Sequence, residues 1–249
     1  MRGSMNSIWR LIPLETHTAF MNMAIDEALT ETVAAGGQPT MRFYQWNPSA
    51  VSIGYFQSLS QEVNEEACKG VSIVRRRTGG GAVYHDMLGE ITYSVIAPES
   101  MFQGITESYQ EICGWIIRSL GNLGIHAEFK PINDVLVKGR KLSGNAQTRR
   151  NKVLLQHGTI LYDVDVDKMF SVLRVPDEKI RDKVIASVKE RVTSVRASCQ
   201  CGKEELYHAL LLGFTDGKQW EISRLSEEEK PRATELARRY ESKEWNYLR

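Results

Sequence analysis

The sequence predicts an α+β fold in which mixed, largely antiparallel β-sheets pack against helices. Short stretches rich in aromatic and β-branched residues are interspersed with longer stretches whose apolar residues recur at helical spacing. These elements do not alternate regularly, as repeated βαβ units would require. The 249 residues, 42% hydrophobic and 25% charged, suffice for one globular domain with a sizeable core.

The first predicted element is a helix. Apolar residues recur at helical spacing from Phe20 to Val33, and Gly36-Gly37 can end the helix in a left-handed cap. Strands at 41–46 and 50–56 follow and are predicted to form a hairpin, with a turn at Asn47-Pro48. The remaining predicted elements are strands at 71–75, 91–95, 135–137, 153–155 and 159–162, and helices at 109–123, 165–174, 203–214 and 227–241.

Composition and charge narrow the class of protein. We expect a single domain over residues 5–249 whose helical part begins near residue 163, while residues 1–4 resemble an expression-tag remnant. A formal net charge of +1 argues against a general nucleic-acid coat protein, and no apolar run approaches the ~18 residues of a membrane-spanning helix. Four cysteines without a secretory leader favour the cytoplasm over a disulfide-stabilised secreted fold.

The most unusual segment is RRRTGGGAVYHD at residues 75–86. Consecutive glycines let the backbone approach a ligand closely, and their N–H groups can form an anion-binding nest. The preceding arginines could bind phosphate or carboxylate. A tight turn with solvated arginines is the alternative, and both interpretations stay open. The segment is neither a P-loop, because no Gly-Lys-Ser/Thr ends it, nor a dinucleotide fingerprint, because its glycines lie between strands.

A second segment, residues 133–152, is basic. It contains six Lys and Arg residues between Lys138 and Lys152 and no acidic residue in that stretch. Lys141 lies beside the small polar residues 143–145, which favours a lysine held in a tight pocket. Such an ammonium could stabilise a phosphate and an adjacent acyl oxygen as negative charge develops. The alternatives are a solvated hairpin and a nucleic-acid patch, although the aromatic stacking partners of the latter are missing.

One histidine and the four cysteines complete the candidate groups. His157 lies between apolar strand residues, where a histidine is usually a satisfied core group. Cys113 falls on the apolar face of a predicted helix and is expected to pack as a small hydrophobic residue. Cys199 and Cys201 are too close in sequence for the usual zinc pairs. We therefore expect no tightly bound metal.

Taken in order along the chain, these motifs resemble the lipoate–protein ligase family, which is related to the biotin ligases. The resemblance implies a biotin/lipoyl protein ligase-like catalytic domain. Single-chain bacterial ligases of this family carry a further C-terminal domain, which we expect to be absent from this protein. The matching segments are residues 22–28, 42–57, 75–86, 133–144, 157–159 and 244–246.

The resemblance also implies which residues form the site. Lys141 is the expected catalytic residue, in contact with the activated carbonyl and phosphate. Asp134 would also meet Mg²⁺ through the nucleotide, and Tyr44, Tyr55 and Phe56 could line an apolar tunnel for the acyl tail. The expected substrate- and adenylate-binding residues are Arg76, Thr78, Gly79, Gly80, Gly81, Ala82, His85, Asn133, Asp134 and His157.

The implied reaction is ATP-dependent activation of lipoate to lipoyl-adenylate, with Mg²⁺ as part of the ATP complex. The lipoyl group would then pass to the ε-amine of a lysine on a carrier, such as a 2-oxoacid dehydrogenase E2 lipoyl domain or the glycine-cleavage H protein. Because the extra domain is missing, a separate small accessory subunit is expected for activation.

Two other functions remain as alternatives. The first is a cysteine-dependent octanoyl- or lipoyltransferase on the same fold, which needs a thiolate near the pocket lysine. Residues 129–132, which lead into Asn133-Asp134, contain no cysteine. The second and more remote one is a nucleic-acid-binding module, which would bind nucleic acid in a salt-dependent way. Neither nucleic acid nor a membrane is an expected partner.

Overall fold

The computed structural model describes residues 7–175 and 180–249, so the expected tag remnant lies outside the described residues. The strands are β1 (Trp9–His17), β2 (Thr40–Trp46), β3 (Ala50–Ile53), β4 (Ser72–Arg75), β5 (Val83–His85), β6 (Glu90–Pro98), β7 (Ala127–Lys130), β8 (Asp134–Val137), β9 (Arg140–Arg150), β10 (Val153–Leu161) and β11 (Trp220–Ile222). The helices are α1 (Ala19–Ala34), α2 (Leu59–Glu62), α3 (Ile105–Asn122), α4 (Val166–Val172), α5 (Arg181–Arg191), α6 (Lys203–Thr215), α7 (Glu229–Glu241) and α8 (Lys243–Asn246).

The described strands form two sheets. The large sheet has eight strands in the order β11-β1-β2-β6-β10-β9-β8-β7. The first three are parallel to one another, and every pairing from β2 to β7 is antiparallel. The small sheet has the order β4-β3-β5. The predicted α+β class with mixed, largely antiparallel sheets is therefore confirmed.

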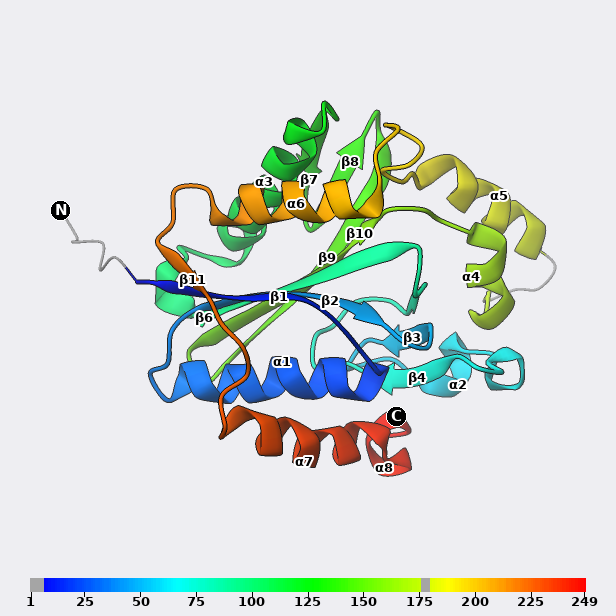
Figure 1. Ribbon diagram of the computed structural model, residues 1–249. Helices are drawn as coiled ribbons and strands as arrows, with labels where there is room; N and C mark the ends of the chain where they lie inside the picture. The colour runs from blue at the N-terminus through cyan, green and yellow to red at the C-terminus, as the bar shows by residue number, and fades with distance from the viewer. Residues whose placement is uncertain (1–6, 176–179) are drawn as a thin grey trace.

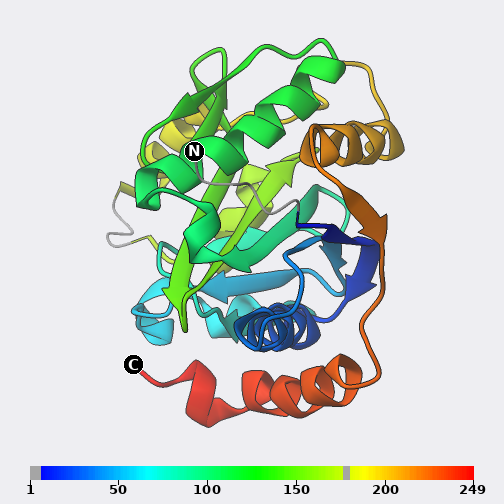
Figure 2. The same ribbon diagram turned by 90° about the vertical axis from the view of Figure 1, so that its left-hand side faces the viewer.

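Helices cover both faces of the large sheet, as Figures 1 and 2 show. On one face, Ile112 and Ile116 of α3 and Leu210 of α6 join one buried cluster with the strands. On the other face, α1 lies against the strands, and α7 packs on its outer side through Leu236 and Tyr240. Each fully buried side chain of this size contributes about 1.5–3 kcal/mol. The large sheet is thus held from both sides and provides a rigid support for β6, β9 and β10.

The small sheet corrects one sequence prediction. β2 and β3 do not form the predicted hairpin, because they belong to different sheets. β3 pairs instead with β4 on one side and with β5 on the other. The glycine-rich segment between β4 and β5 must therefore cross the end of β3. It passes so close to Gly54 that a β-carbon there would lie 2.0 Å from the carbonyl oxygen of Gly80.

A second correction concerns β10, which runs through the two strands predicted at 153–155 and 159–162. Gly158 lies within this strand, where the absence of a side chain leaves space for the neighbouring strand β9. A β-carbon at Gly158 would lie 2.0 Å from Oδ1 of Asn145. The helices predicted near α1, α3, α4, α6 and α7 are confirmed, whereas the prediction missed β1, β5, β7, β9, β11, α2, α5 and α8.

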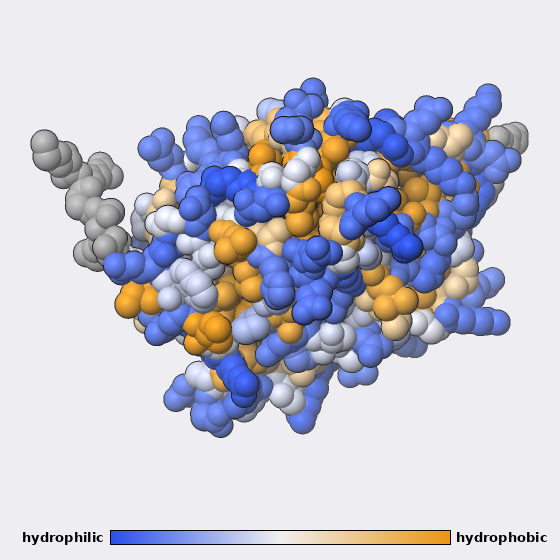
Figure 3. Space-filling view, turned by 45° about the horizontal axis from the view of Figure 1, so that its top comes forward, coloured by the Kyte–Doolittle hydropathy of each residue, from blue (hydrophilic) through white to orange (hydrophobic). Residues whose placement is uncertain are grey.

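After residue 163 the helices occupy several places in the fold. α4 and α5 pack with the small sheet, and α6 packs with α3, while α7 packs with α1. The domain division expected at this point stays a prediction. Figure 3 shows that the face formed by α3 and α6 is covered mainly by hydrophilic side chains with small hydrophobic clusters between them. None of the described helices combines the length and hydropathy needed to span a bilayer.

Candidate active site

A cavity of about 310 Å³ is enclosed by the small sheet with its glycine-rich segment and by strands β2, β6, β9 and β10. This volume lies at the lower end of the ~300–1,000 Å³ typical of small-molecule sites. The predicted site residues that line it are Arg76, Gly80, Gly81, Ala82, His85, Asn133, Lys141 and His157, and the predicted tunnel residue Tyr44 lines it as well.

The other predicted residues lie just outside the lining. The Thr78 hydroxyl is hydrogen-bonded to His157, and Asp134 forms an ion pair with Lys141. Gly79 accepts a hydrogen bond from Arg76 through its carbonyl oxygen. Tyr55 and Phe56 are not among the lining residues. The structure thus gathers the two predicted segments around one cavity, and the individual roles stay predictions.

Lys141 lies at the rim of the cavity, near the start of β9. The hairpin that carries it turns at Lys138 and Gly139, whose φ values of 49° and 73° are those of a type I′ turn. The ammonium of Lys141 is 2.7 Å from Oδ1 of Asp134, and 42% of its side chain is exposed. Gly144 provides the space, because a β-carbon there would lie 2.8 Å from Nζ of Lys141.

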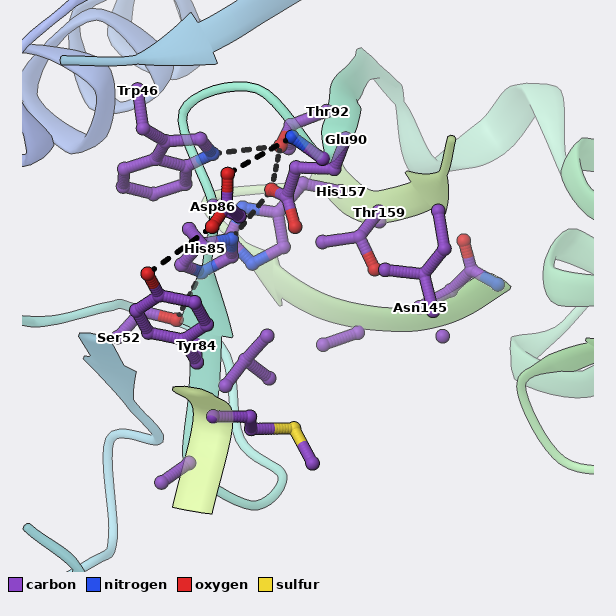
Figure 4. Close-up of a pocket in the computed structure, with 18 of the residues that line it drawn as sticks. Trp46, Ser52, Tyr84, His85, Asp86, Glu90, Thr92, Asn145, His157 and Thr159 are labelled. Carbon is purple, nitrogen blue, oxygen red and sulfur yellow. Dashed lines mark hydrogen bonds and ion pairs between the residues drawn. The ribbon is translucent and has the colours of Figure 1, made fainter. Parts of the chain in front are cut away.

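The interior end of the cavity carries a chain of buried polar groups, all at most 4% exposed. Figure 4 shows that Ser52, His85, Glu90, Thr92 and Trp46 are linked in that order. Nε2 of His85 is 2.8 Å from the Ser52 hydroxyl, and Nδ1 is 2.7 Å from Oε1 of Glu90. The Thr92 hydroxyl donates to Glu90, and the Trp46 indole donates to Thr92.

The chain fixes the tautomer of His85. In a neutral imidazole, Nδ1 donates to the Glu90 carboxylate and Nε2 accepts from the hydroxyl of Ser52. The imidazole also stacks on Trp46, with ring centroids 3.9 Å apart. Oε2 of Glu90 has no hydrogen-bond partner among the described residues, whereas the ring nitrogens of His85 and Trp46 are hydrogen-bonded, so the two rings present their faces and carbon atoms to a ligand. Such a surface suits an apolar chain.

A second buried chain supports His157. Its Nε2 lies 2.7 Å from the Thr78 hydroxyl, and its Nδ1 lies 3.4 Å from Oδ2 of Asp26. Burial lowers the pKa of His157 and outweighs the opposite effect of Asp26. Burial alone would raise the pKa of Asp26, but the hydrogen bond to His157 and the charge of Arg42 lower it. His157 is therefore held in its neutral form in a fixed orientation.

Arg76 shapes the glycine-rich segment. Its guanidinium donates to the carbonyl oxygens of Gly79 and Gly81, each at 2.7 Å, and to that of Ser52 at 3.0 Å. Nε donates to the hydroxyl of Thr78. Burial lowers the pKa of Arg76 to about 10, so it stays charged at neutral pH. The segment is thus folded around a buried cation.

Comparison with known proteins identifies the family. Residues 18–215 match the family described as the lipoyl protein ligase A/B catalytic domain. The chain belongs to this family. The bi-partite lipoate protein ligase of Thermoplasma acidophilum superposes with a TM-score of 0.88 at 34% identity, covering 98% of each chain.

Two relatives in the lipoyl protein ligase A/B family bear on the activity. Octanoyltransferase LipM of Brevibacillus brevis is 38% identical and covers 97% of this chain and 99% of its own length. Octanoyltransferase LipM of Kyrpidia tusciae is 39% identical and covers 96% and 98%, respectively. The protein is therefore an enzyme of the lipoate ligase and acyltransferase family.

These relatives overturn the main functional prediction. The prediction of an ATP-dependent lipoate ligase is wrong, because relatives that match nearly the whole chain are named octanoyltransferases. The motifs did not separate the two kinds of enzyme, because the ligase structure and the octanoyltransferases both resemble this chain over nearly its whole length. With adenylation withdrawn, the expected ATP, Mg²⁺, Asp134 metal contact and accessory subunit lose their basis.

The cysteines are distributed in a way that matters for a transferase of this family. All four are among the described residues, and none of them lines the cavity. Cys199 and Cys201 form a disulfide. Cys68 is half-buried, and its thiol donates a hydrogen bond to the carbonyl of Asn64. Cys113 comes nearest: its Sγ is 3.4 Å from Nδ2 of Asn145, which lines the cavity. Burial raises the pKa of Cys113 to about 12, so its thiol stays protonated.

Sequence reasoning missed several residues of the site. Asn22 and Asp26 lie four residues apart on the buried face of α1, where Arg42 binds both. Their signal was two polar residues on the apolar side of a helix. Ser52 and Glu90 carried no comparable signal, because only the fold brings them to His85. No group of three or more His, Cys, Asp or Glu side chains suited to a metal occurs in residues 7–175 and 180–249.

Proposed function

We propose that the protein transfers an octanoyl group from a thioester donor to the ε-amine of a lysine on a lipoyl carrier domain. The observation that carries this proposal is the near full-length similarity to proteins named octanoyltransferase LipM. The structure of the bi-partite ligase, described together with its E2 lipoyl domain, supports a lipoyl domain as the acceptor. The E2 domains and the H protein are thus the carriers to test.

The exposure of the lining residues supports one orientation of the acyl chain. The acceptor lysine belongs to a folded carrier, so the acyl carbonyl must lie where that lysine can reach it. Lys141, with 42% of its side chain exposed, lies at such a position, whereas Ser52, His85 and Trp46 are almost fully buried. The hydrocarbon tail would then extend toward His85 and Trp46, whose polar atoms are already hydrogen-bonded.

The proposed chemistry is aminolysis of the thioester. The amine nitrogen attacks the acyl carbon, the new C–N bond forms, and the C–S bond breaks. The leaving thiolate takes up the proton that the amine loses. Lys141 would stabilise the negative charge on the carbonyl oxygen, and Asp134 would hold its ammonium in place at 2.7 Å. His157 and the glycine-rich segment would hold the chain in register with Lys141.

We further propose that this transfer is direct, without an acyl-enzyme thioester. An attacking cysteine needs a thiolate within reach of the acyl carbon. None of the described cavity-lining residues is a cysteine, and the nearby Cys113 thiol lies behind Asn145 with a raised pKa.

Intact-mass spectrometry of the carrier tests the proposed function. The protein is incubated with an octanoyl thioester of pantetheine and an apo lipoyl domain. We expect one octanoyl group to be added to the carrier. A matched carrier with the acceptor lysine replaced by arginine should stay unmodified. Absence of the adduct, or an equal adduct on the arginine carrier, would reject the proposal.

A further inference from the structure

The outer edge of β4 is covered by side chains of the C-terminal helix α8. β4 ends at Arg75, directly before the glycine-rich segment, and among the described strands it pairs only with β3. On its other edge, the N–H of Arg75 donates to Oδ1 of Asn246 at 2.7 Å. The indole N–H of Trp245 donates to the carbonyl of Arg75 at 2.8 Å. Two side chains thus take the hydrogen-bonding positions of a neighbouring strand.

The side chain of Arg75 extends this contact. It is fully buried, and its Nη2 donates to the carbonyl of Asn246 at 2.8 Å. Nη1 donates to the carbonyls of Gly54, Tyr55 and Gln57 at 3.1, 3.0 and 2.6 Å. Arg75 therefore links α8 to the loop that follows β3.

This loop touches the glycine-rich segment directly. The N–H of Tyr55 donates to the carbonyl of Thr78 at 2.9 Å, and Gly54 lies against the carbonyl of Gly80. The guanidinium of Arg77 adds a second tie, because it lies 4.6 Å from the ring centroid of Trp245. The contacts from α8 thus reach the glycine-rich segment in two ways, directly through Arg77 and indirectly through the loop at residues 54–57.

We propose that Trp245 and Asn246 are positioning residues for the glycine-rich segment. Neither residue lines the cavity, so they act through Arg75 and the 54–57 loop. By fixing the end of β4, they set the starting point of the stretch that carries Arg76, Gly80 and Gly81 into the cavity wall. The activity part of this inference rests on the proposed transfer, whereas its structural part does not.

Asn246→Ala provides the direct test. It removes the acceptor for the Arg75 N–H and leaves a buried donor unpaired. We expect amide hydrogen exchange at Tyr55 and Arg76, whose N–H groups donate to the carbonyls of Thr78 and Ile53, to become about tenfold faster, the equivalent of one lost buried hydrogen bond. Exchange in the centre of β10 should not change, and kcat for octanoyl transfer should fall. Asn246→Asp keeps the acceptor oxygen for Arg75, but its second oxygen would face the carbonyls of Tyr240 and Ser242, which now accept from Nδ2, so it should not restore slow exchange.

Two further variants make the test independent of folding defects. Trp245→Phe keeps the aromatic packing but loses the bond to the Arg75 carbonyl, so it should show the same local change. Glu244→Ala alters an exposed residue of the same helix and should match the wild type. Unchanged exchange at Tyr55 and Arg76, or equal acceleration throughout β10, would overturn the inference. Exchange decides the question even if no octanoyl transfer is detected.

Discussion

Replacing Lys141 by alanine should abolish most of the acyl transfer while the fold is retained. The ammonium is the cation at the cavity rim beside Asp134, and a comparable charge-stabilising donor contributes about 10²–10³ in kcat, or roughly 2.7–4 kcal/mol. The stability cost should be small. The pair is partly exposed, and exposed ion pairs contribute only ~0–1 kcal/mol. The backbone bond from Thr193 to the carbonyl of residue 141 does not need the side chain.

Initial rates of octanoyl transfer to an apo lipoyl domain, followed by intact mass, measure this effect. Thermal unfolding of the same preparation shows whether the fold is retained. Lys130→Ala is the matched control, because it removes the same charge from an exposed position outside the cavity lining. A Lys141→Ala enzyme that keeps more than about half of the wild-type kcat would refute the role of the ammonium.

Three other predictions test separate parts of the site. Gly144→Ala places a β-carbon 2.8 Å from the ammonium of Lys141. Because small displacements of catalytic groups are costly, it should lower kcat by about tenfold or more with little change in Tm. An unchanged kcat would argue against a fixed lysine. Replacing all four cysteines by serine or alanine should preserve kcat per folded molecule, and an octanoyl adduct on the wild-type enzyme would contradict this. Burial lowers the pKa of His157 from its ordinary 6.5, so below that pH the unfolded state binds more protons. The free energy of unfolding from urea titrations should therefore fall as pH decreases from 6.5 through the lowered pKa. His157→Gln should flatten this part of the curve, and an identical slope in the variant would rule out His157 as its source.

The helices and several strands could be predicted because their signals are local. Apolar spacing marked α1 and α3, and short runs of aromatic and β-branched residues marked β2 and β4. Strand pairing was not local. β3 joins β4 and β5 through contacts that the residues near Asn47-Pro48 do not encode, so the predicted hairpin was wrong.

The candidate site was predicted in outline for a similar reason. Lys141 and the glycine-rich segment are conspicuous in the sequence, and the cavity brings them together. The partners of His85 come from β3 and β6, and Asp26 comes from α1, so only the folded chain reveals them. The source of the activated acyl group leaves no mark on these residues. The sequence could therefore predict that these two segments share one site, whereas it led to the ligase rather than the transferase.

The form of the octanoyl donor tests the central claim most directly. Two reactions are compared on the same apo lipoyl domain by intact mass, one with octanoyl-pantetheine and no nucleotide, the other with free octanoate and Mg·ATP. We expect the carrier to be modified in the first reaction, at a rate that added ATP does not change, and to stay unmodified in the second. Modification only from free octanoate and ATP would contradict the account.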